Sequence, residues 1–125
     1  PTAGGPDSEL SAEIARLLEA EFGATVTLLH VADDEQAGRA FLDEWAESHG
    51  LGEATLRVET GDVEAAIERA AGDASMVIIG ATEEGLLSRL VRGALVLDIV
   101  DDVECSVLLA ERARKRGLLE RLVGR

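Results

Sequence analysis

The chain has 125 residues, the size of one ordinary domain, so we expect it to bury a single hydrophobic core. Its 25 acidic and 12 basic residues give a formal net charge of −13, which makes nucleic acid and anionic membranes poor partners for the bulk of the domain because like charges repel. The single cysteine, Cys105, rules out an intrachain disulfide and favours the cytoplasm, and no apolar run approaches the roughly 18 residues of a membrane span.

The composition resembles that of cytosolic proteins from salt-loving microbes. Lys115 is the only lysine, acidic residues are in excess, and aromatic residues make up 2% of the chain. In molar salt the Debye length falls to about 3 Å, so repulsion among these charges is mostly screened. We therefore expect the fold to become more stable as salt is added.

The amino-terminal part of the chain predicts a loop, a helix and a strand. Residues 1–6 contain two prolines and two glycines and are expected to form a loop. A helix capped by Asp7 or Ser8 follows and ends at Gly23. Its apolar face is expected to consist of Leu10, Ile14, Leu17, Leu18 and Phe22. Residues 24–31 are too apolar for a solvated face and predict an interior parallel strand.

The next elements alternate between helix and strand. Asp33 or Asp34 caps a second helix, which ends near residues 49–50. The apolar face of that helix is expected to hold Ala37, Phe41, Leu42 and Trp45. Residues 54–59 alternate apolar and charged side chains, a pattern typical of a half-exposed edge strand, and a third helix capped by Asp62 covers residues 63–71.

The carboxyl-terminal part begins with a buried strand at residues 76–79. A loop, a helix at 86–100, a turn at 101–102 and a final strand at 106–110 follow, and residues 112–125 predict a basic amphipathic tail outside the domain of residues 1–111. Strands that alternate with helices in this way predict an α/β fold, with a doubly wound, mostly parallel sheet and helices on both faces. The junction after residue 79 is where such folds bind ligands, at the carboxyl end of a strand.

With the residues around Gly80 included, the chain resembles universal stress protein domains, an adenine nucleotide alpha hydrolase-like fold that is usually dimeric. ATP-binding members carry Gly-x-x-Gly, nine residues, and then Gly-Ser or Gly-Thr. Gly80, Glu83, Gly93 and Ala94 occupy those four places, so two match and two do not. Shorter matches at residues 29–31, 61–63 and 105–109 keep the family's order and spacing. The resemblance covers residues 1–110.

The resemblance implies which positions would face ATP. They are Thr2, Ala3, Val31, Gly80, Thr82, Glu83, Gly93, Ala94 and Leu95. Glu83 and the adjacent Glu84 would place carboxylates where a triphosphate should lie, and Ala94 lacks the hydroxyl that relatives offer to phosphate. We therefore expect no ATP cofactor. The alternative stays open, because Arg89 and Arg92 or a bridging magnesium ion would compensate.

Two further expectations follow from resemblance. Residues 1–5 are similar to the loop after the family's first, central strand, where Ala3 stands in place of a common aspartate. That strand is therefore expected to lie upstream of Pro1, which would leave four strands with a gap, filled by a partner chain or by rearrangement. Residues 86–122 also resemble universal stress protein domains fused to the carboxyl end of haloarchaeal cationic amino-acid transporters.

No catalytic group of side chains is evident. His30 and His49 lack a second metal ligand at suitable spacing, so packing or capping is the expected role. Cys105 adjoins an apolar strand without a nearby base, which predicts an inert, buried thiol, and Ser88 and Ser106 have no histidine partner. The chain is not expected to be an enzyme.

The sequence therefore predicts a cytoplasmic regulatory or dimerisation domain that does not bind ATP. The resemblance implies a homodimer formed through the last strand, at Val107 and Leu109, and possible membership of a transporter whose membrane domain lies in the same polypeptide. An ATP-binding universal stress protein, with the nucleotide in the loop from Gly80 to Leu95, is the alternative.

Overall fold

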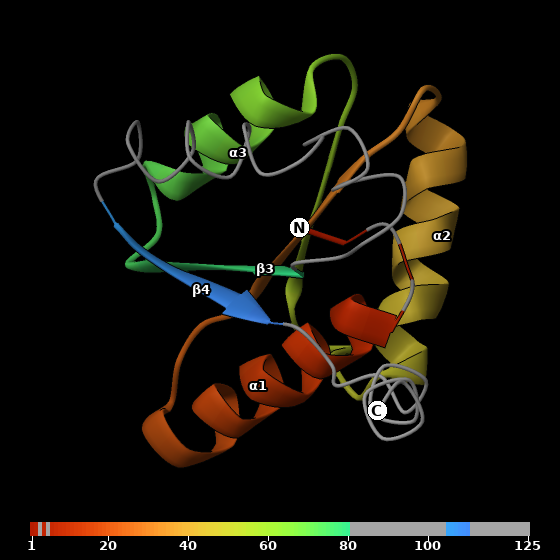
Figure 1. Ribbon diagram of the computed structural model, residues 1–125. Coiled ribbons are helices and arrows are strands. Elements are labelled where there is room, and N and C mark those ends of the chain that lie inside the picture. Colours follow the sequence, from red (N-terminus) through yellow and green to blue (C-terminus); the bar gives the residue numbers. More distant parts are fainter. Residues whose placement is uncertain (3, 5, 81–104, 111–125) are drawn as a thin grey trace, which may run out of the picture.

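The computed structural model describes residues 1, 2, 4, 6–80 and 105–110, and their helices and strands alternate along the chain (Figure 1). The elements are α1 (Pro6–Phe22), β1 (Thr27–Val31), α2 (Glu35–Ser48), β2 (Thr55–Glu59), α3 (Val63–Ala71), β3 (Met76–Gly80) and β4 (Ser106–Ala110). The helix predicted at 86–100, the turn at 101–102 and the tail at 112–125 lie outside the described residues. The predicted α/β order is confirmed for the rest.

The four strands form two parallel pairs. β1 pairs with β2, from Thr27 opposite Thr55 to Val31 opposite Glu59. β3 pairs with β4 in the same manner, and residues 76–80 lie opposite residues 106–110. The described strands therefore make two two-stranded sheets, which agrees with the expected four strands with a gap. The interruption falls between β1 and β3, and residues 1, 2 and 4 are not part of any strand.

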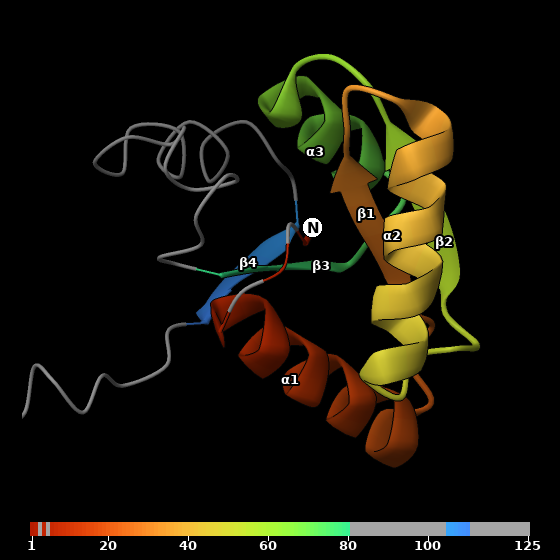
Figure 2. The same ribbon diagram turned by 90° about the vertical axis from the view of Figure 1, so that its right-hand side faces the viewer.

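The two sheets nevertheless share the same two covering layers. Because side chains alternate along a strand, Leu29 and Val77 point to one face and pack with residues of α3. Leu28 and Ile78 point to the opposite face and pack in the cluster that α1 and α2 complete. Figures 1 and 2 show α1 and α2 on one side and α3 on the other. Helices on both faces are thus confirmed, and each of the two core clusters draws side chains from both sheets.

Helix α1 departs from its predicted start and its predicted buried face. It begins at Pro6, so Asp7 and Ser8 lie within its first turn and are not its cap. Proline suits the first helical position, where no amide partner is needed. Leu17 is 58% exposed and Phe22 79% exposed, whereas the buried positions are small: Ser8, Ala12 and Ala15. The small side chains bring α1 close to β3, against which it packs.

Strand β1 is shorter than predicted, because Gly23 and Ala24 finish the preceding helix. Gly23 takes a positive φ of 66°, its amide donates to the Glu19 carbonyl at 3.1 Å, and the Ala24 amide donates to the Leu18 carbonyl at 3.3 Å. These bonds satisfy carbonyls that the helix end would leave without partners. Regular pairing with β2 then starts at Thr27.

Helix α2 is capped by Asp34, whose carboxylate accepts a hydrogen bond from the Ala37 amide at 3.0 Å. Leu42 and Trp45 are buried as predicted, but Ala37 is exposed. Gly38 is buried in its place, because a helix residue without a side chain lets α2 approach β1 and β2 closely. Helix α3 begins after Asp62, as predicted, and the Ala65 amide donates to that carboxylate at 2.9 Å.

Candidate functional site

The carboxyl ends of β1 and β3 are the candidate site, since ligands of open α/β folds bind beyond the strand ends. Val31 ends β1 and Gly80 ends β3. Val31 packs against the core cluster that contains Ile79, so the two strand ends share one apolar layer. Of the predicted ATP-facing positions, Thr2, Val31 and Gly80 are described. The remaining ones lie outside the described residues: Ala3, Thr82, Glu83, Gly93, Ala94 and Leu95.

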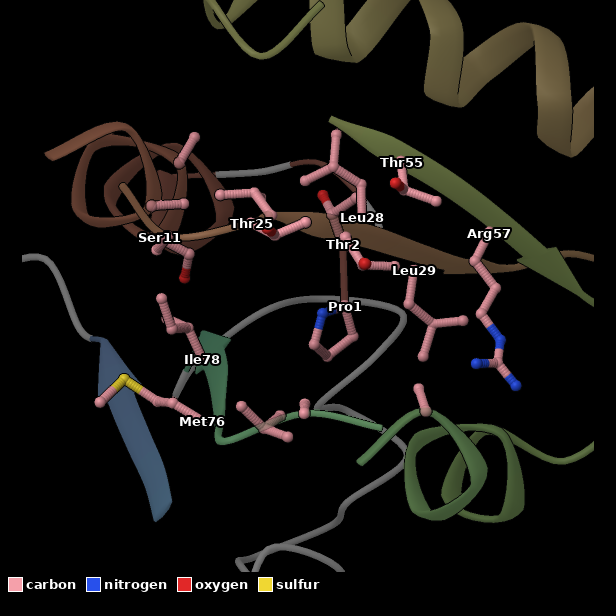
Figure 3. A pocket seen from close by; sticks show the side chains of 18 of the residues that line it. Pro1, Thr2, Ser11, Thr25, Leu28, Leu29, Thr55, Arg57, Met76 and Ile78 are labelled. Carbon is pink, nitrogen blue, oxygen red and sulfur yellow. The ribbon is translucent and has the colours of Figure 1, made fainter. Parts of the chain in front are cut away.

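Thr2 is held firmly beside β1 (Figure 3). Its amide donates to the Leu29 carbonyl at 2.7 Å, and its hydroxyl oxygen accepts from the Gly4 amide at 3.2 Å. The residue is only 4% exposed. The hydroxyl that would face a nucleotide thus already has a role in shaping the amino-terminal turn.

His30 also has a structural role. Its Nδ1 donates to the Thr2 carbonyl at 2.7 Å, since a carbonyl oxygen only accepts, and its ring lies 4.5 Å from the Phe41 ring, centroid to centroid. His49 caps the end of α2 in a similar way. Its Nδ1 donates to the Trp45 carbonyl at 2.7 Å and its ring stacks on the Trp45 indole. The predicted packing and capping roles of both histidines are confirmed.

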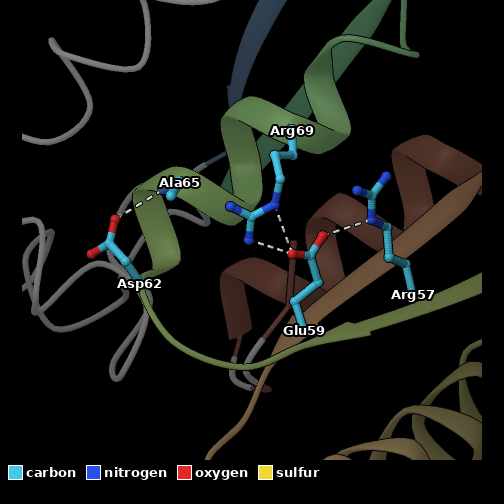
Figure 4. Close-up of polar contacts among 5 residues, drawn as sticks. All are labelled: Arg57, Glu59, Asp62, Ala65 and Arg69. Atoms are coloured by element: carbon cyan, nitrogen blue, oxygen red, sulfur yellow. Dashed lines mark hydrogen bonds and ion pairs between the residues drawn. The ribbon is translucent and has the colours of Figure 1, made fainter.

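An ion-pair cluster lies at the carboxyl end of β2 (Figure 4). Glu59 Oε2 accepts from Arg57 Nε at 2.8 Å, and Glu59 Oε1 accepts from Arg69 Nε at 3.0 Å and also from Arg69 Nη2. The Arg69 hydrogen bond, helped by Arg57, lowers the pKa of Glu59 below its ordinary value, although partial burial opposes the shift. Glu59 is paired with Val31 in the ladder, so the cluster adjoins the candidate site. Both guanidinium groups bind a carboxylate of the protein itself.

The described residues contain no cluster of side chains suited to a metal ion. Cys105 is half-buried against the core next to β4 and was expected to be fully buried. Asp34 acts as a helix cap, as expected of the acidic pair at residues 33–34.

A cavity of about 730 Å³ lies between the two sheets, toward the amino ends of β1 and β3 (Figure 3). Pro1 and Thr2 line it together with residues 24–29 of the β1 region, residues 73–78 of the β3 region and Trp45. Val31, Glu59 and Gly80 do not line it. The cavity therefore lies mainly toward the opposite ends of the strands, but it shares Thr2 and Arg57 with the candidate site and the ion-pair cluster beside it.

Sequence reasoning missed two of these features. Arg57 and Glu59 were assigned only to the exposed side of an edge strand, and nothing connected them with Arg69 ten residues later. The expected gap for a missing strand indicated where a cavity would lie but not which side chains would line it. Within the described part of the chain, no helix is long and apolar enough to cross a membrane.

Comparison with known proteins identifies the fold. No family model and no curated protein sequence matches the chain. The chain is similar in structure to a universal stress protein solved in complex with cAMP, with a TM-score of 0.64 and 18% sequence identity. The match covers 87% of this chain and 90% of that one. The likeness, together with the parallel strand pairs and the helices on both faces, shows that this chain has the universal stress protein fold.

Proposed function

We propose that the chain is a regulatory domain, not an enzyme, and that the carboxyl ends of β1 and β3 do not hold ATP. The observation that carries this proposal is the pairing of both Arg57 and Arg69 with Glu59. The single Glu59 carboxylate holds both guanidinium groups and offsets one of their two positive charges, so they offer less to a triphosphate than two free arginines would. His30 and Thr2 likewise bond each other.

The sequence of the adjoining loop supports the same conclusion. Glu83 takes the place of a glycine that lets backbone amides approach phosphate in ATP-binding universal stress proteins, and Glu84 follows it. A like charge at about 4 Å costs on the order of 4 kcal/mol at an effective dielectric constant of 20, or roughly a thousandfold in affinity. Ala94 would leave one phosphate oxygen without a hydroxyl donor.

A titration with magnesium and ATP tests this proposal by calorimetry in molar KCl. We expect no saturable heat for the natural chain at nucleotide concentrations up to about 1 mM. The Glu83→Gly, Ala94→Ser double variant should gain binding if those residues block the site, and Ala94→Ser alone serves as the control that keeps the repulsive carboxylate. Micromolar binding by the natural chain would overturn the proposal.

A second candidate is an adenine nucleotide with less charge, which the neighbour's complex with cAMP favours. A cyclic monophosphate carries a single negative charge, so Glu83 would repel it far less than it repels a triphosphate. Titrating cAMP beside ATP separates the two cases. Saturable binding of cAMP alone would support this candidate, and absence of binding for both nucleotides would leave the regulatory role without an adenine ligand.

We further propose a homodimer formed through β4. Ser106 donates its amide to the Ser75 carbonyl of the β3 side, so the backbone groups of Val107 and Leu109 turn to the opposite edge of β4. No described strand pairs with that edge. Sedimentation should show a dimer, and Leu109→Pro, which removes an outward amide, should shift it to monomer. A monomeric natural chain would contradict this proposal.

The cytoplasmic placement and the link to a cationic amino-acid transporter are also proposals. They rest on the resemblance of residues 86–122 and on the acidic composition. The gene segment upstream of the Pro1 codon tests the link. Several membrane spans there would support it, and an upstream stop codon in the same frame would contradict it.

A further inference from the structure

We propose that the basic tail of the chain, residues 112–125, docks on the outer side of α1 and covers an apolar stripe there with its own leucines. The stripe consists of Leu10, Ile14 and Leu17, and we call it the α1 stripe. None of its three residues lines the cavity between β1 and β3. The docking surface is therefore distinct from that cavity and from the candidate site at the carboxyl ends of the strands.

The α1 stripe lies on the side of the helix that faces away from the strands. Its residues are three or four positions apart, so they follow one side of the helix. Ala12 and Ala15 are buried on the other side, where α1 packs against β3. Leu17 is 58% exposed, and Leu10 and Ile14 are half-buried. Helix α1 thus has a second apolar side that the strands do not fully cover.

Leu108 of β4 adds to this apolar surface. It is paired with Ile78 in the ladder, and Ile78 packs in the cluster that α1 and α2 complete. Paired residues of neighbouring strands point to the same face of a sheet, so Leu108 points to the α1 side. It is 37% exposed, and α1 packs against β4 (Figures 1 and 2).

The charges around the stripe favour a cationic partner. Helix α1 contains five acidic residues and a single basic one, Arg16. Its last turn has no basic residue, and Glu21 lies four residues after Leu17, on the same side of the helix. The carbonyl groups at a helix end carry partial negative charge, which also attracts cations. An apolar segment flanked by basic side chains therefore fits this surface.

The tail has this chemistry. Residues 112–125 hold six of the 12 basic residues of the chain and one acidic residue, Glu120. Four apolar side chains of the tail fall at helical spacing: Leu118, Leu119, Leu122 and Val123. In molar salt the Debye length is about 3 Å, so the apolar contacts would hold the tail and the arginines would set its direction.

The tail is also long enough to reach the whole stripe. Strand β4 ends at Ala110 and packs against α1. Residues 111–117 span up to about 25 Å when extended, and the 17 residues of α1 are about 25 Å long. The leucines that follow residue 117 can therefore be placed anywhere along α1.

Other occupants fit the stripe less well. A strand upstream of Pro1 would pack against the inner side of α1, at Ala12 and Ala15, and would leave Leu17 uncovered. The step from β3 to β4 runs outward in the opposite direction from the step from β1 to β2, so right-handed crossovers would place residues 81–104 on the α3 side. A second copy of α1 would bring like charges together.

Cross-linking of the full chain tests the proposal, because Lys115 is the only lysine. A carbodiimide joins the Lys115 amine to a carboxylate in contact with it, as an amide. In molar KCl, peptide mass spectrometry should show Lys115 joined to carboxylates of α1 within one chain, and the exposed carboxylates of α2 are the internal comparison.

Two substitutions test whether the leucines make the contact. Leu17→Gln, which keeps a good helix former, should lower the yield of this cross-link by at least about fivefold. Leu122→Gln in the tail should have the same effect and keeps the test valid if Leu17→Gln unfolds the chain. Ala37→Gln on the exposed side of α2 is the matched control and should leave the yield unchanged.

Several results would overturn the proposal. They include the absence of any Lys115 cross-link and a cross-link to α2 or α3 as often as to α1. A cross-link between two chains would assign the stripe to the tail of a second copy. An unchanged yield in both glutamine variants would mean that charge alone brings the tail to α1.

Discussion

Gly38 of α2 provides the sharpest test of how closely α2 packs on β1 and β2. A Cβ atom at this position would lie 2.8 Å from Ala32 Cβ and 2.8 Å from Val58 Cγ1, closer than real Cβ contacts allow. Both neighbours are short side chains, on and directly after the strands, and have no flexible end that could swing away. Gly38→Ala must therefore push α2 off β1 and β2.

Two opposing effects set the size of the change. Alanine favours a helix interior over glycine by about 1 kcal/mol. Overpacking a close contact costs about 1–3 kcal/mol, and two rigid neighbours point to the upper half of that range. The net effect of Gly38→Ala is then a loss of about 1–2 kcal/mol in the free energy of unfolding, or a fall of roughly 4–8 °C in Tm.

Denaturation by urea in molar KCl, followed by circular dichroism, measures this difference. The matched control is Gly72→Ala at the end of α3. Gly72 has a φ of −59°, which alanine adopts freely, and its Cβ would meet only the Arg69 carbonyl at 3.4 Å. We expect that variant to be unchanged or up to about 1 kcal/mol more stable. A midpoint for Gly38→Ala at or above that of the natural chain would refute the reasoning.

Two other predictions concern charge. With a net charge of −13, Tm should rise between about 0.1 and 1 M KCl as the Debye length shrinks from about 10 to 3 Å, and a fall over this range would contradict the argument from self-repulsion. Glu59→Gln should destabilise the fold by about 1 kcal/mol at pH 7, because it breaks the ion pairs with Arg57 and Arg69, whereas exposed Glu53→Gln should have little effect. Folding lowers the pKa of Glu59 below its ordinary 4.5. The stability difference between the natural chain and Glu59→Gln should therefore persist above pH 4.5 and disappear as the pH falls through the lowered pKa. A stability difference that does not change with pH would argue against the ion pairs.

Local signals in the chain predicted most of the described elements and several of their ends. Helix caps were predicted at Asp62 and at either Asp33 or Asp34, because a short acidic side chain can accept a bond from an amide three residues later, wherever the helix finally packs. The β strands were recognisable from their apolar runs, which are likewise a signal carried by neighbouring residues. His30 and His49 lacked partners at ligand spacing, and their structural roles followed.

Burial faces were predicted less well, because they depend on what a helix meets. Leu17 and Phe22 match the helical period as well as Ala12 and Ala15 do, yet only the small pair is buried, since α1 lies close to β3. Gly38 is buried for a similar reason, because the absence of a side chain lets α2 pack closely on β1 and β2. Periodicity along one helix cannot show which of its faces packs against the strands.

The sequence by itself determined the α/β order, the helix caps, the acidic charge and the likeness to universal stress proteins, because these depend on neighbouring residues and on composition. Only the tertiary structure decided that Arg57 and Arg69 meet Glu59, and that β1 and β3 face each other across a cavity with Thr2 on its edge. Such contacts join segments from separate elements, and no local pattern specifies their distance or direction.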